Sequence, residues 1–241
     1  MEKIKQNPFV KKVGFNRIVL CCVLLLMYGL FCALTGGSFA GMNRIMSALN
    51  YAYFLGFLSL GVTFVIATGQ IDFSIGPVMF CCALISGYTL TTHGISMPVA
   101  FLISILVGFA FGLFNGYLVA YWSVPSFITS MASMNIAKGL ASVYTKTQSV
   151  SWPQAADPDN GWFRNLVRYN GFPVGLVILL VVAVICAIIL NKTRIGRYIL
   201  SLGSNKEAVR LSGVNVKKWE MAAYVICGLL VGISALFYVA A

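Results

Sequence analysis

The chain has 241 residues, of which 59% are hydrophobic and only 10% are charged. Soluble domains carry about a quarter charged residues, so this composition excludes a soluble globular protein and indicates an integral membrane protein. The net charge of +11 does not indicate a nucleic-acid binder, because the basic residues gather in two patches beside apolar segments, as topology-setting charges do.

The first element is a basic N-terminus followed by an apolar run at residues 18–35. The basic residues ahead of this run are Lys3, Lys5, Lys11, Lys12 and Arg17. Signal peptides share this layout, but the residues from Phe31 to Leu34 fit a cleavage site poorly. We therefore expect an uncleaved first span, with residues 1–17 in the cytoplasm.

Seven segments are long and apolar enough for a helix of about 20 residues to cross a bilayer. They are residues 18–35, 45–67, 76–92, 98–121, 126–144, 173–190 and 221–241. The prediction is an all-α, polytopic membrane helix bundle of about seven spans that occupies residues 18–241. The last span reaches Ala241 without a polar or aromatic anchor, so we expect a chain that is incomplete at its C-terminus.

Charge counting orients these spans. With the basic N-terminus inside, the loop 145–172 falls outside and the loop 191–220 falls inside. The inner loop holds seven basic residues against two acidic ones, Glu207 and Glu220, all expected in water, whereas the outer loop is nearly balanced. The charge excess therefore agrees with the helix count. The outer loop either docks a substrate-delivery protein or is a plain connector.

The fourth apolar segment carries Gly108, Gly112 and Gly116 on one helix face, and Gly228 and Gly232 repeat this spacing in the last segment. Small residues at four-residue spacing let membrane helices approach closely. The pattern predicts tight helix packing and identifies no function.

Asp72 stands between the second and third apolar segments, beside Gly69 and Gly76. An acid at the bilayer centre costs roughly 2.5–3.5 kcal/mol on insertion scales, so this position needs an explanation. The residue is either a cap for a helix that begins near Ser74 or Ile75, a group in a polar pathway or gate at a helix break, or a proton relay. The relay has the weakest basis, because no partner acid or histidine accompanies it.

Two asparagines, Asn115 and Asn135, lie within apolar segments, and Gln70 gives a weaker signal of the same kind. Each asparagine either donates a hydrogen bond across helices or lines a substrate path.

The residue patterns of an enzyme are missing from the sequence. It contains no phosphate-binding Gly-rich loop with Lys and Ser or Thr, no Ser/His/Asp set and no paired carboxylates. The seven cysteines all lie in apolar runs without metal-ligand spacing. We therefore expect no catalysis and no cofactor in this chain, and energy for pumping must come from elsewhere.

The inner loop contains a short helix-forming segment at 205–212 that Gly213 ends. This helix is either a solvated connector or a rigid knob that receives a push from a cytoplasmic partner. Its charged residues suit a polar docking cleft.

Three stretches together resemble the membrane permeases of ribose-type sugar ABC importers. They are Gly69-Gln-Ile-Asp-Phe-Ser-Ile-Gly76, then the glycine-rich Gly108 to Gly116 with its Asn115, and then Val124-Pro-Ser-Phe-Ile-Thr129. The loop Leu202 to Val216 resembles the cytoplasmic coupling segment of that family. Here Val209 replaces the second alanine of the general Glu-Ala-Ala pattern and the later Leu-Pro is absent, which leaves the docking geometry open.

The resemblance implies a permease subunit in the bacterial plasma (inner) membrane that translocates a monosaccharide or related small polar solute delivered by a binding protein. The implied partners are ATP-binding-cassette ATPase subunits, which carry ATP and Mg, a second permease subunit and an extracytoplasmic solute-binding protein. The expected ATPase-coupling residues are Lys206, Glu207, Ala208, Arg210 and Gly213. The residues expected at the translocation path or helix break are Gly69, Asp72, Ser74, Gly76 and Asn115.

An ion-coupled secondary transporter or channel is the alternative function. Such a transporter is expected to carry membrane-embedded acids for coupling, and Asp72 is the candidate that the sequence offers. A third alternative, a structural or receptor protein, is not supported, because the sequence shows no soluble signalling domain.

Overall fold

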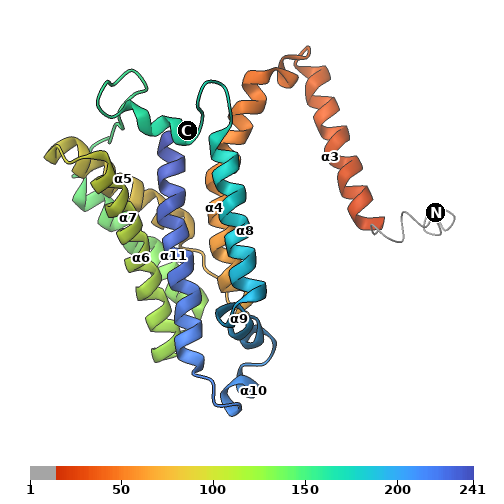
Figure 1. The fold of residues 1–241 in the computed structure, drawn as a ribbon, viewed down its shortest axis with the longest axis vertical. Helices are drawn as coiled ribbons and strands as arrows, with labels where there is room; N and C mark the ends of the chain where they lie inside the picture. Colours follow the sequence, from red (N-terminus) through yellow and green to blue (C-terminus); the bar gives the residue numbers. More distant parts are fainter. Residues whose placement is uncertain (1–14) are drawn as a thin grey trace. The chain divides into compact units, whose positions relative to one another are not determined.

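The computed structural model describes residues 15–241, which form helices joined by loops, with no β-strand within that range. The predicted cytoplasmic N-terminus, residues 1–17, lies mostly outside the described residues. The α-helices are α3 (Phe15–Leu34), α4 (Met42–Ala67), α5 (Ile75–His93), α6 (Met97–Trp122), α7 (Ser126–Tyr144), α8 (Val174–Lys192), α9 (Arg194–Ser204), α10 (Lys206–Leu211) and α11 (Val216–Ala240). The prediction of an all-α membrane helix bundle is confirmed (Figure 1).

The chain divides into two units, Met1–Ala48 and Leu49–Ala241. The first unit contains α3, the short 3-10 helix η1 (Ser38–Ala40) and the first residues of α4. The ring of Phe39 in η1 packs against Tyr28 and Phe31 of α3, with ring centroids 5.6 and 5.5 Å apart.

Each of the seven predicted spans folds as a helix within a few residues of its expected bounds. Of the described helices, five are long and apolar enough to cross a membrane: α4, α5, α6, α8 and α11. The apolar part of α3, Val19–Leu34, is shorter than these five helices. Helix α7 is not among the five and contains several polar residues: Thr129, Ser130, Ser133, Asn135 and Lys138. The expected count of seven spans is therefore not confirmed.

In the second unit, α11 is the central helix, with α6 on one side and α4 and α8 on the other (Figure 1). Its face toward α4 is closed by Phe57 and Phe237, whose ring centroids lie 4.5 Å apart. The hydroxyl of Ser234 also donates a hydrogen bond to the Phe54 carbonyl oxygen at 2.8 Å. Burial of apolar side chains around this helix forms most of the core of the unit.

The glycine faces of α6 and α11 pack directly against each other, which confirms the predicted tight packing and shows which two helices make it. A Cβ atom added at Gly112 would lie 2.5 Å from the Tyr224 carbonyl oxygen, and one added at Gly228 would lie 2.9 Å from the Gly112 Cα atom. The hydroxyl of Ser104 donates to the Gly232 carbonyl oxygen at 2.9 Å across the same contact. Backbone therefore meets backbone along this pair of helices.

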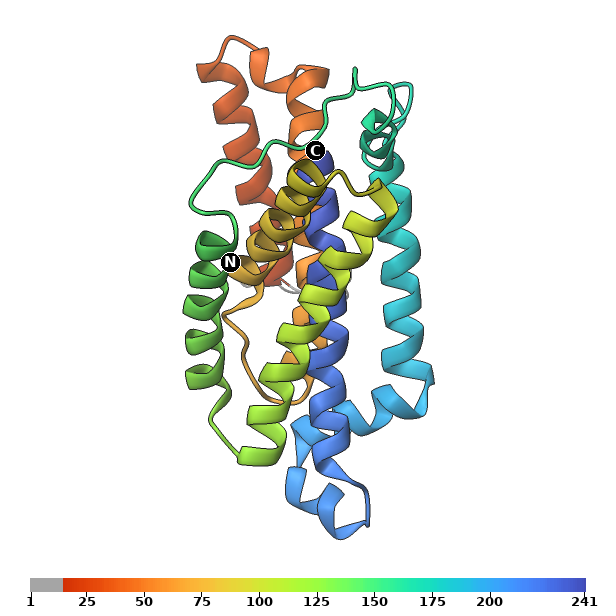
Figure 2. The same cartoon turned by 90° about the vertical axis from the view of Figure 1, so that its left-hand side faces the viewer.

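Two helices of the second unit, α5 and α7, begin partway along the bundle. After α4 ends at Ala67, residues 68–74 run back along the bundle before α5 begins beside the middle of α11 (Figure 2). Similarly, residues 123–125 lead from the lower end of α6 to an α7 that starts higher (Figure 2). The segment 68–74 is therefore a helix break at depth in the bundle, the kind of place where polar groups can be used inside a membrane protein.

The long loop after α7 lies at one end of the second unit and α9 and α10 lie at the other (Figure 1). The loop contains the 3-10 helix η2 (Gly161–Leu166), and its Arg164 donates to the Pro153 carbonyl oxygen at 3.0 Å. The loops 145–172 and 191–220 are thus separated as the helix count requires, and the assignment of one end to the cytoplasm stays a prediction.

Candidate functional site

The segment that follows α8 folds into two short helices. Asn205 caps α10, because its side-chain oxygen accepts a hydrogen bond from the Ala208 amide at 3.0 Å. The helix ends at Leu211, and Gly213 follows with φ +79°, a left-handed conformation that a Cβ disfavours. The prediction of a short helix that Gly213 ends is therefore confirmed, and its role in coupling stays a prediction.

One face of α10 is fixed to the bundle and the other faces outward. Val209 is buried in a small apolar cluster with Leu202 of α9 and Val216 of α11. Ala208 is exposed, in contrast, and Leu211 is 76% exposed. The outward side of this anchored helix therefore presents a small residue and an uncovered leucine among the described residues.

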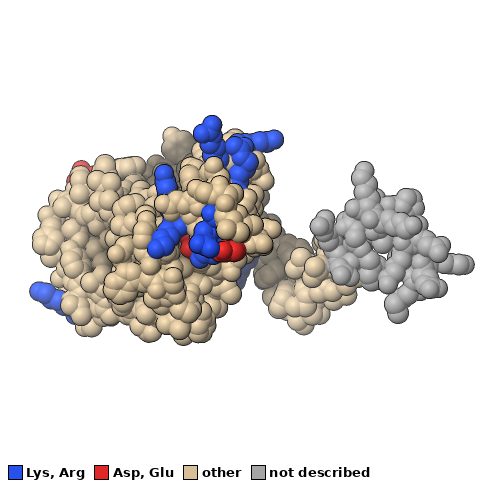
Figure 3. Space-filling view, turned by 90° about the horizontal axis from the view of Figure 1, so that it is seen from below, with Lys and Arg blue, Asp and Glu red and all other residues tan. Residues whose placement is uncertain are grey.

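Basic side chains gather at the end of the second unit that carries α10 (Figure 3). The basic residues of the region are all exposed: Lys192, Arg194, Arg197, Lys206, Arg210, Lys217 and Lys218. Seen from below, Lys and Arg side chains gather over this end of the molecule (Figure 3). Arg210 donates to the Glu207 carboxylate from Nε at 2.9 Å and from Nη2 at 2.5 Å, and these bonds hold the pKa of that carboxyl below its usual value. Glu207 therefore remains charged at neutral pH.

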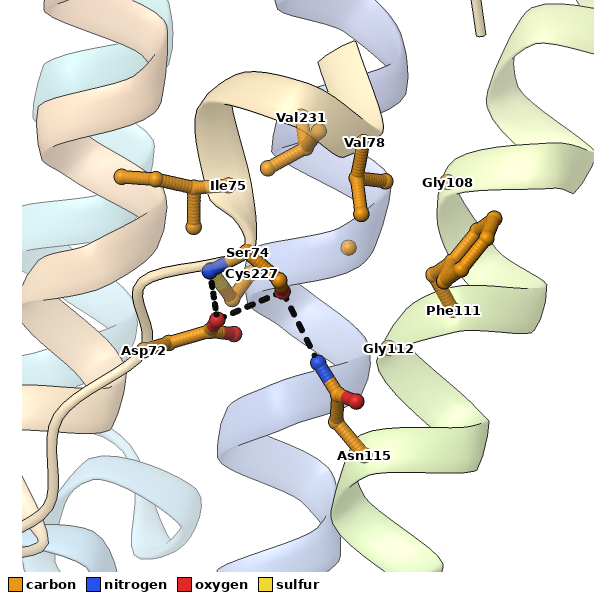
Figure 4. A pocket seen from close by; sticks show the side chains of 11 residues that line it. Asp72, Ser74, Ile75, Val78, Gly108, Phe111, Gly112, Asn115, Cys227 and Val231 are labelled. Carbon is orange, nitrogen blue, oxygen red and sulfur yellow. Dashed lines mark hydrogen bonds between the residues drawn. The ribbon is translucent and has the colours of Figure 1, made fainter. Parts of the chain in front are cut away.

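Asp72, Ser74 and Asn115, which the sequence places at the pathway or helix break, lie in one hydrogen-bonded chain (Figure 4). Asp72 Oδ1 accepts from the Ser74 amide at 2.8 Å and from the Ser74 hydroxyl at 2.6 Å. Asn115 Nδ2 donates to Ser74 Oγ at 3.0 Å, and Ser133 of α7 donates to Asn115 Oδ1. These hydrogen bonds join the segment 68–74 to α6 and α7, so Asn115 makes a bond across helices, one of the two roles that the sequence allows it.

Asp72 does not occupy the N-cap position of α5, because Ser74 does. Instead, the Asp72 carboxylate accepts a hydrogen bond from the backbone amide of Ser74, the residue just before the helix. Gly69 has φ +80°, which explains a glycine at the turn that follows α4. A Cβ added at Gly76 would meet no described atom within 4 Å, so packing among the described residues does not require glycine there.

A cavity of about 10 Å³ adjoins these hydrogen-bonded residues, between the segment 68–74, α5, α6 and α11. Its polar lining comes from Asp72, Ser74 and Asn115, and its remaining walls are apolar or glycine (Figure 4). Such a volume holds at most about one water molecule, whereas small-molecule sites measure roughly 300–1,000 Å³. This cavity is therefore not a monosaccharide site in the conformation described.

A second polar cluster was not predicted from the sequence. Glu220, expected in water within the inner loop, lies on α11 and is 2% exposed. Asn215 caps α11 by accepting a hydrogen bond from the Lys218 amide at 3.1 Å, so the helix starts early enough to carry Glu220 into the bundle. Its carboxylate accepts hydrogen bonds from Lys206 and from Gln70. The sequence offered only a weak signal, a polar Gln70 beside a helix break.

Asn135 behaves differently from Asn115. Its amide donates to the Met131 carbonyl oxygen on its own helix at 3.0 Å, so it makes no bond across helices among the described residues. The cysteines carry no disulfide and, with the other candidate ligands in residues 15–241, form no group that would hold a metal ion.

Comparison with known proteins assigns this arrangement to a family. Residues 44–241, which include α10, α11 and both polar clusters, match the family described as "Branched-chain amino acid transport system / permease component". The chain belongs to this permease family. The chain is also similar to the fructose import permease protein FruF of Bifidobacterium longum, with 30% identity over 98% of this chain and 68% of that protein. The ribose import permease protein RbsC of Escherichia coli K12 is 32% identical over 84% of this chain and 63% of its own length.

A more distant relative of this permease is the xylose transport system permease protein XylH of Haemophilus influenzae, at 25% identity over 94% of this chain and 76% of that protein. The permease spans about two thirds of the length of FruF and RbsC. No solved structure matches the chain. The family description names amino acids and these relatives are named for sugars, so membership in the family does not by itself fix the substrate.

Proposed function

We propose that this permease is the membrane subunit of an ATP-binding-cassette importer and that it translocates a monosaccharide. The observation that carries the proposal is α10, a capped helix fixed by Val209 with its other face exposed at the basic end of the bundle. The fructose, ribose and xylose names of the relatives support a sugar as the substrate class. The sequence contains no ATPase motif, so energy is supplied by a partner subunit.

The proposal assigns one partner to each end of the second unit. An ATPase subunit, which carries ATP and Mg, receives the exposed face of α10 with Glu207, Ala208 and Arg210 around it. A solute-binding protein delivers the sugar at the opposite end, where the loop 145–172 lies. A second permease subunit completes the translocation path. The complex resides in the bacterial inner membrane, with the N-terminus of the permease in the cytoplasm.

The transport step makes and breaks no covalent bond in this chain. ATPase closure pushes α10, and the bundle converts the push into a change in access along the path. Because the cavity beside Asp72 is about 10 Å³, a sugar crosses this level only after the surrounding helices separate or along a path beside them.

The test is reconstitution of the full-length permease with its ATPase and binding protein. Ala208→Trp places a bulky group on the exposed face of α10, and Gly213→Val forces a β-branched residue into a left-handed conformation. Both variants are expected to insert in the membrane, because neither residue lies in a membrane-spanning helix, and to lose ATPase retention or substrate-stimulated hydrolysis.

Ala155→Trp, an equally bulky change at an exposed residue of the opposite loop, is the matched control and should retain the ATPase. If Ala208→Trp and Gly213→Val both assemble and transport as the parent does, α10 is only a connector. Uptake by the permease alone, driven by an ion gradient, would favour the secondary-transporter alternative.

A further inference from the structure

The Glu220 carboxylate joins three segments that are far apart in sequence. Lys206 Nζ, at the start of α10, donates to Glu220 Oε1 at 2.8 Å and to Oε2 at 3.0 Å. Gln70 Nε2, in the segment 68–74, donates to Glu220 Oε1. The Tyr224 hydroxyl, one turn further along α11, donates to Gln70 Oε1 at 2.7 Å and so holds the amide of Gln70 in place.

Glu220 depends on this contact more than Lys206 does, because the two side chains differ in burial. The Glu220 side chain is 2% exposed, whereas that of Lys206 is 58% exposed. A buried carboxylate is costly unless it is paired and hydrogen-bonded, so Glu220 favours the arrangement in which Lys206 and Gln70 both reach it. Moving α10 away from α11 would leave the carboxylate without its cation.

The far end of this cluster is the helix break. Gln70 lies two residues before Asp72, whose carboxylate starts the chain of hydrogen bonds to Ser74 and Asn115. A second contact joins the same two regions, because Gly203 at the end of α9 lies against the backbone at the end of α4. A Cβ added at Gly203 would overlap the Ala67 carbonyl oxygen and lie 3.4 Å from the Gly69 amide nitrogen.

We propose that Lys206, Glu220 and Gln70 form a link that transmits movement of α10 to the segment 68–74 and thereby to Asp72. The three are positioning residues, and this inference rests on the proposed function, because α10 moves only if a partner acts on it. A pair that merely stabilised α10 would affect folding and assembly and would leave the transport achieved per ATP unchanged.

The experiment measures the sugar transported per ATP hydrolysed by the full-length permease, reconstituted with its ATPase and binding protein. Glu220→Gln keeps the size of the side chain and an acceptor for Gln70 but removes the attraction for Lys206. Lys206→Gln removes the cation from the other end. Tyr224→Phe removes only the hydroxyl that orients Gln70. It tests the link even if Glu220→Gln folds poorly. Lys192→Gln, at an exposed lysine at the end of α8, is the matched control.

Glu220→Gln and Lys206→Gln are each expected to retain the ATPase and to lower transport per ATP by about fivefold or more, the lower end of typical coupling between two sites. Tyr224→Phe should lower the same ratio by a smaller factor, and Lys192→Gln should match the parent. The charge-swapped pair, Lys206→Glu with Glu220→Lys, should recover more of the ratio than either single change allows.

The link is refuted if assembled Glu220→Gln, Lys206→Gln and Tyr224→Phe all transport as much sugar per ATP as the parent. It is also refuted if the swapped pair assembles but is no better coupled than the single Lys206→Glu and Glu220→Lys changes. A parent that fails to retain any ATPase would instead refute the proposed function, and the two failures are thus distinguishable.

Discussion

Gly108 of α6 and Gly228 of α11 are in backbone contact, so that a Cβ atom added to either glycine would overlap the carbonyl oxygen of the other. Atoms of the main chain have no alternative rotamer with which to avoid such an overlap. The two helices must therefore separate or shift to accept any larger residue, and α11 is the helix around which the second unit is packed.

Gly228→Ala is therefore expected to destabilise the full-length protein by about 1–3 kcal/mol, the usual cost of overpacking. The measurement is thermal unfolding in detergent. Gly139→Ala is the control, because a Cβ added at that position of α7 meets no described atom within 4 Å. Equal melting temperatures for the two variants would contradict the close approach of α6 and α11.

Asp72 provides the second prediction. Asp72→Asn keeps a side-chain oxygen that can accept from the Ser74 amide, so folding and transport should largely survive. Asp72→Leu leaves the buried Ser74 donors without that acceptor and should cost about 1–3 kcal/mol of stability, together with transport. Unfolding and uptake are measured for both variants. Loss of all transport in a normally assembled Asp72→Asn would show that the charge itself is needed.

Ser133 tests the hydrogen-bonded chain at its other end. Ser133→Ala removes the hydroxyl that donates to Asn115 Oδ1 and should destabilise the protein by about 0.5–1.5 kcal/mol. Ser201→Ala is matched in chemistry, since its hydroxyl donates to the Arg197 carbonyl oxygen on its own exposed helix turn, and it should have a smaller effect. If unfolding shows the reverse order, Ser133 does not hold α7 to α6.

The last prediction concerns orientation. Cysteines introduced at Ala156 and at Ser212, both exposed and at opposite ends of the second unit, should react from opposite sides of the membrane. A membrane-impermeant maleimide should label Ala156→Cys from outside in intact cells, and Ser212→Cys only after the membrane is opened. Labelling of both positions from the same side would overturn the charge-based topology.

Local patterns predicted the helices and several of their details. Length and hydropathy place helices at all seven expected segments because a chain in lipid must satisfy its backbone hydrogen bonds within each segment. The glycine spacing predicted that each helix packs closely, without naming its partner, and Gly213 predicted the end of α10. Each of these features depends on residues within a few turns of one another, so the sequence alone contains the information.

The polar clusters depend on which helix faces meet, and only the tertiary structure decided that. The sequence left Asn115 with two possible roles, a hydrogen bond across helices or the lining of a path, and it could not name the partners Ser74 and Ser133, which come from two other segments. Glu220 read as a loop acid in water because its neighbours Lys217 and Lys218 are charged, yet the early start of α11 turns it into the bundle. Its bond to Gln70 spans 150 residues of sequence, and it exists because the segment that follows α4 lies against the first turns of α11.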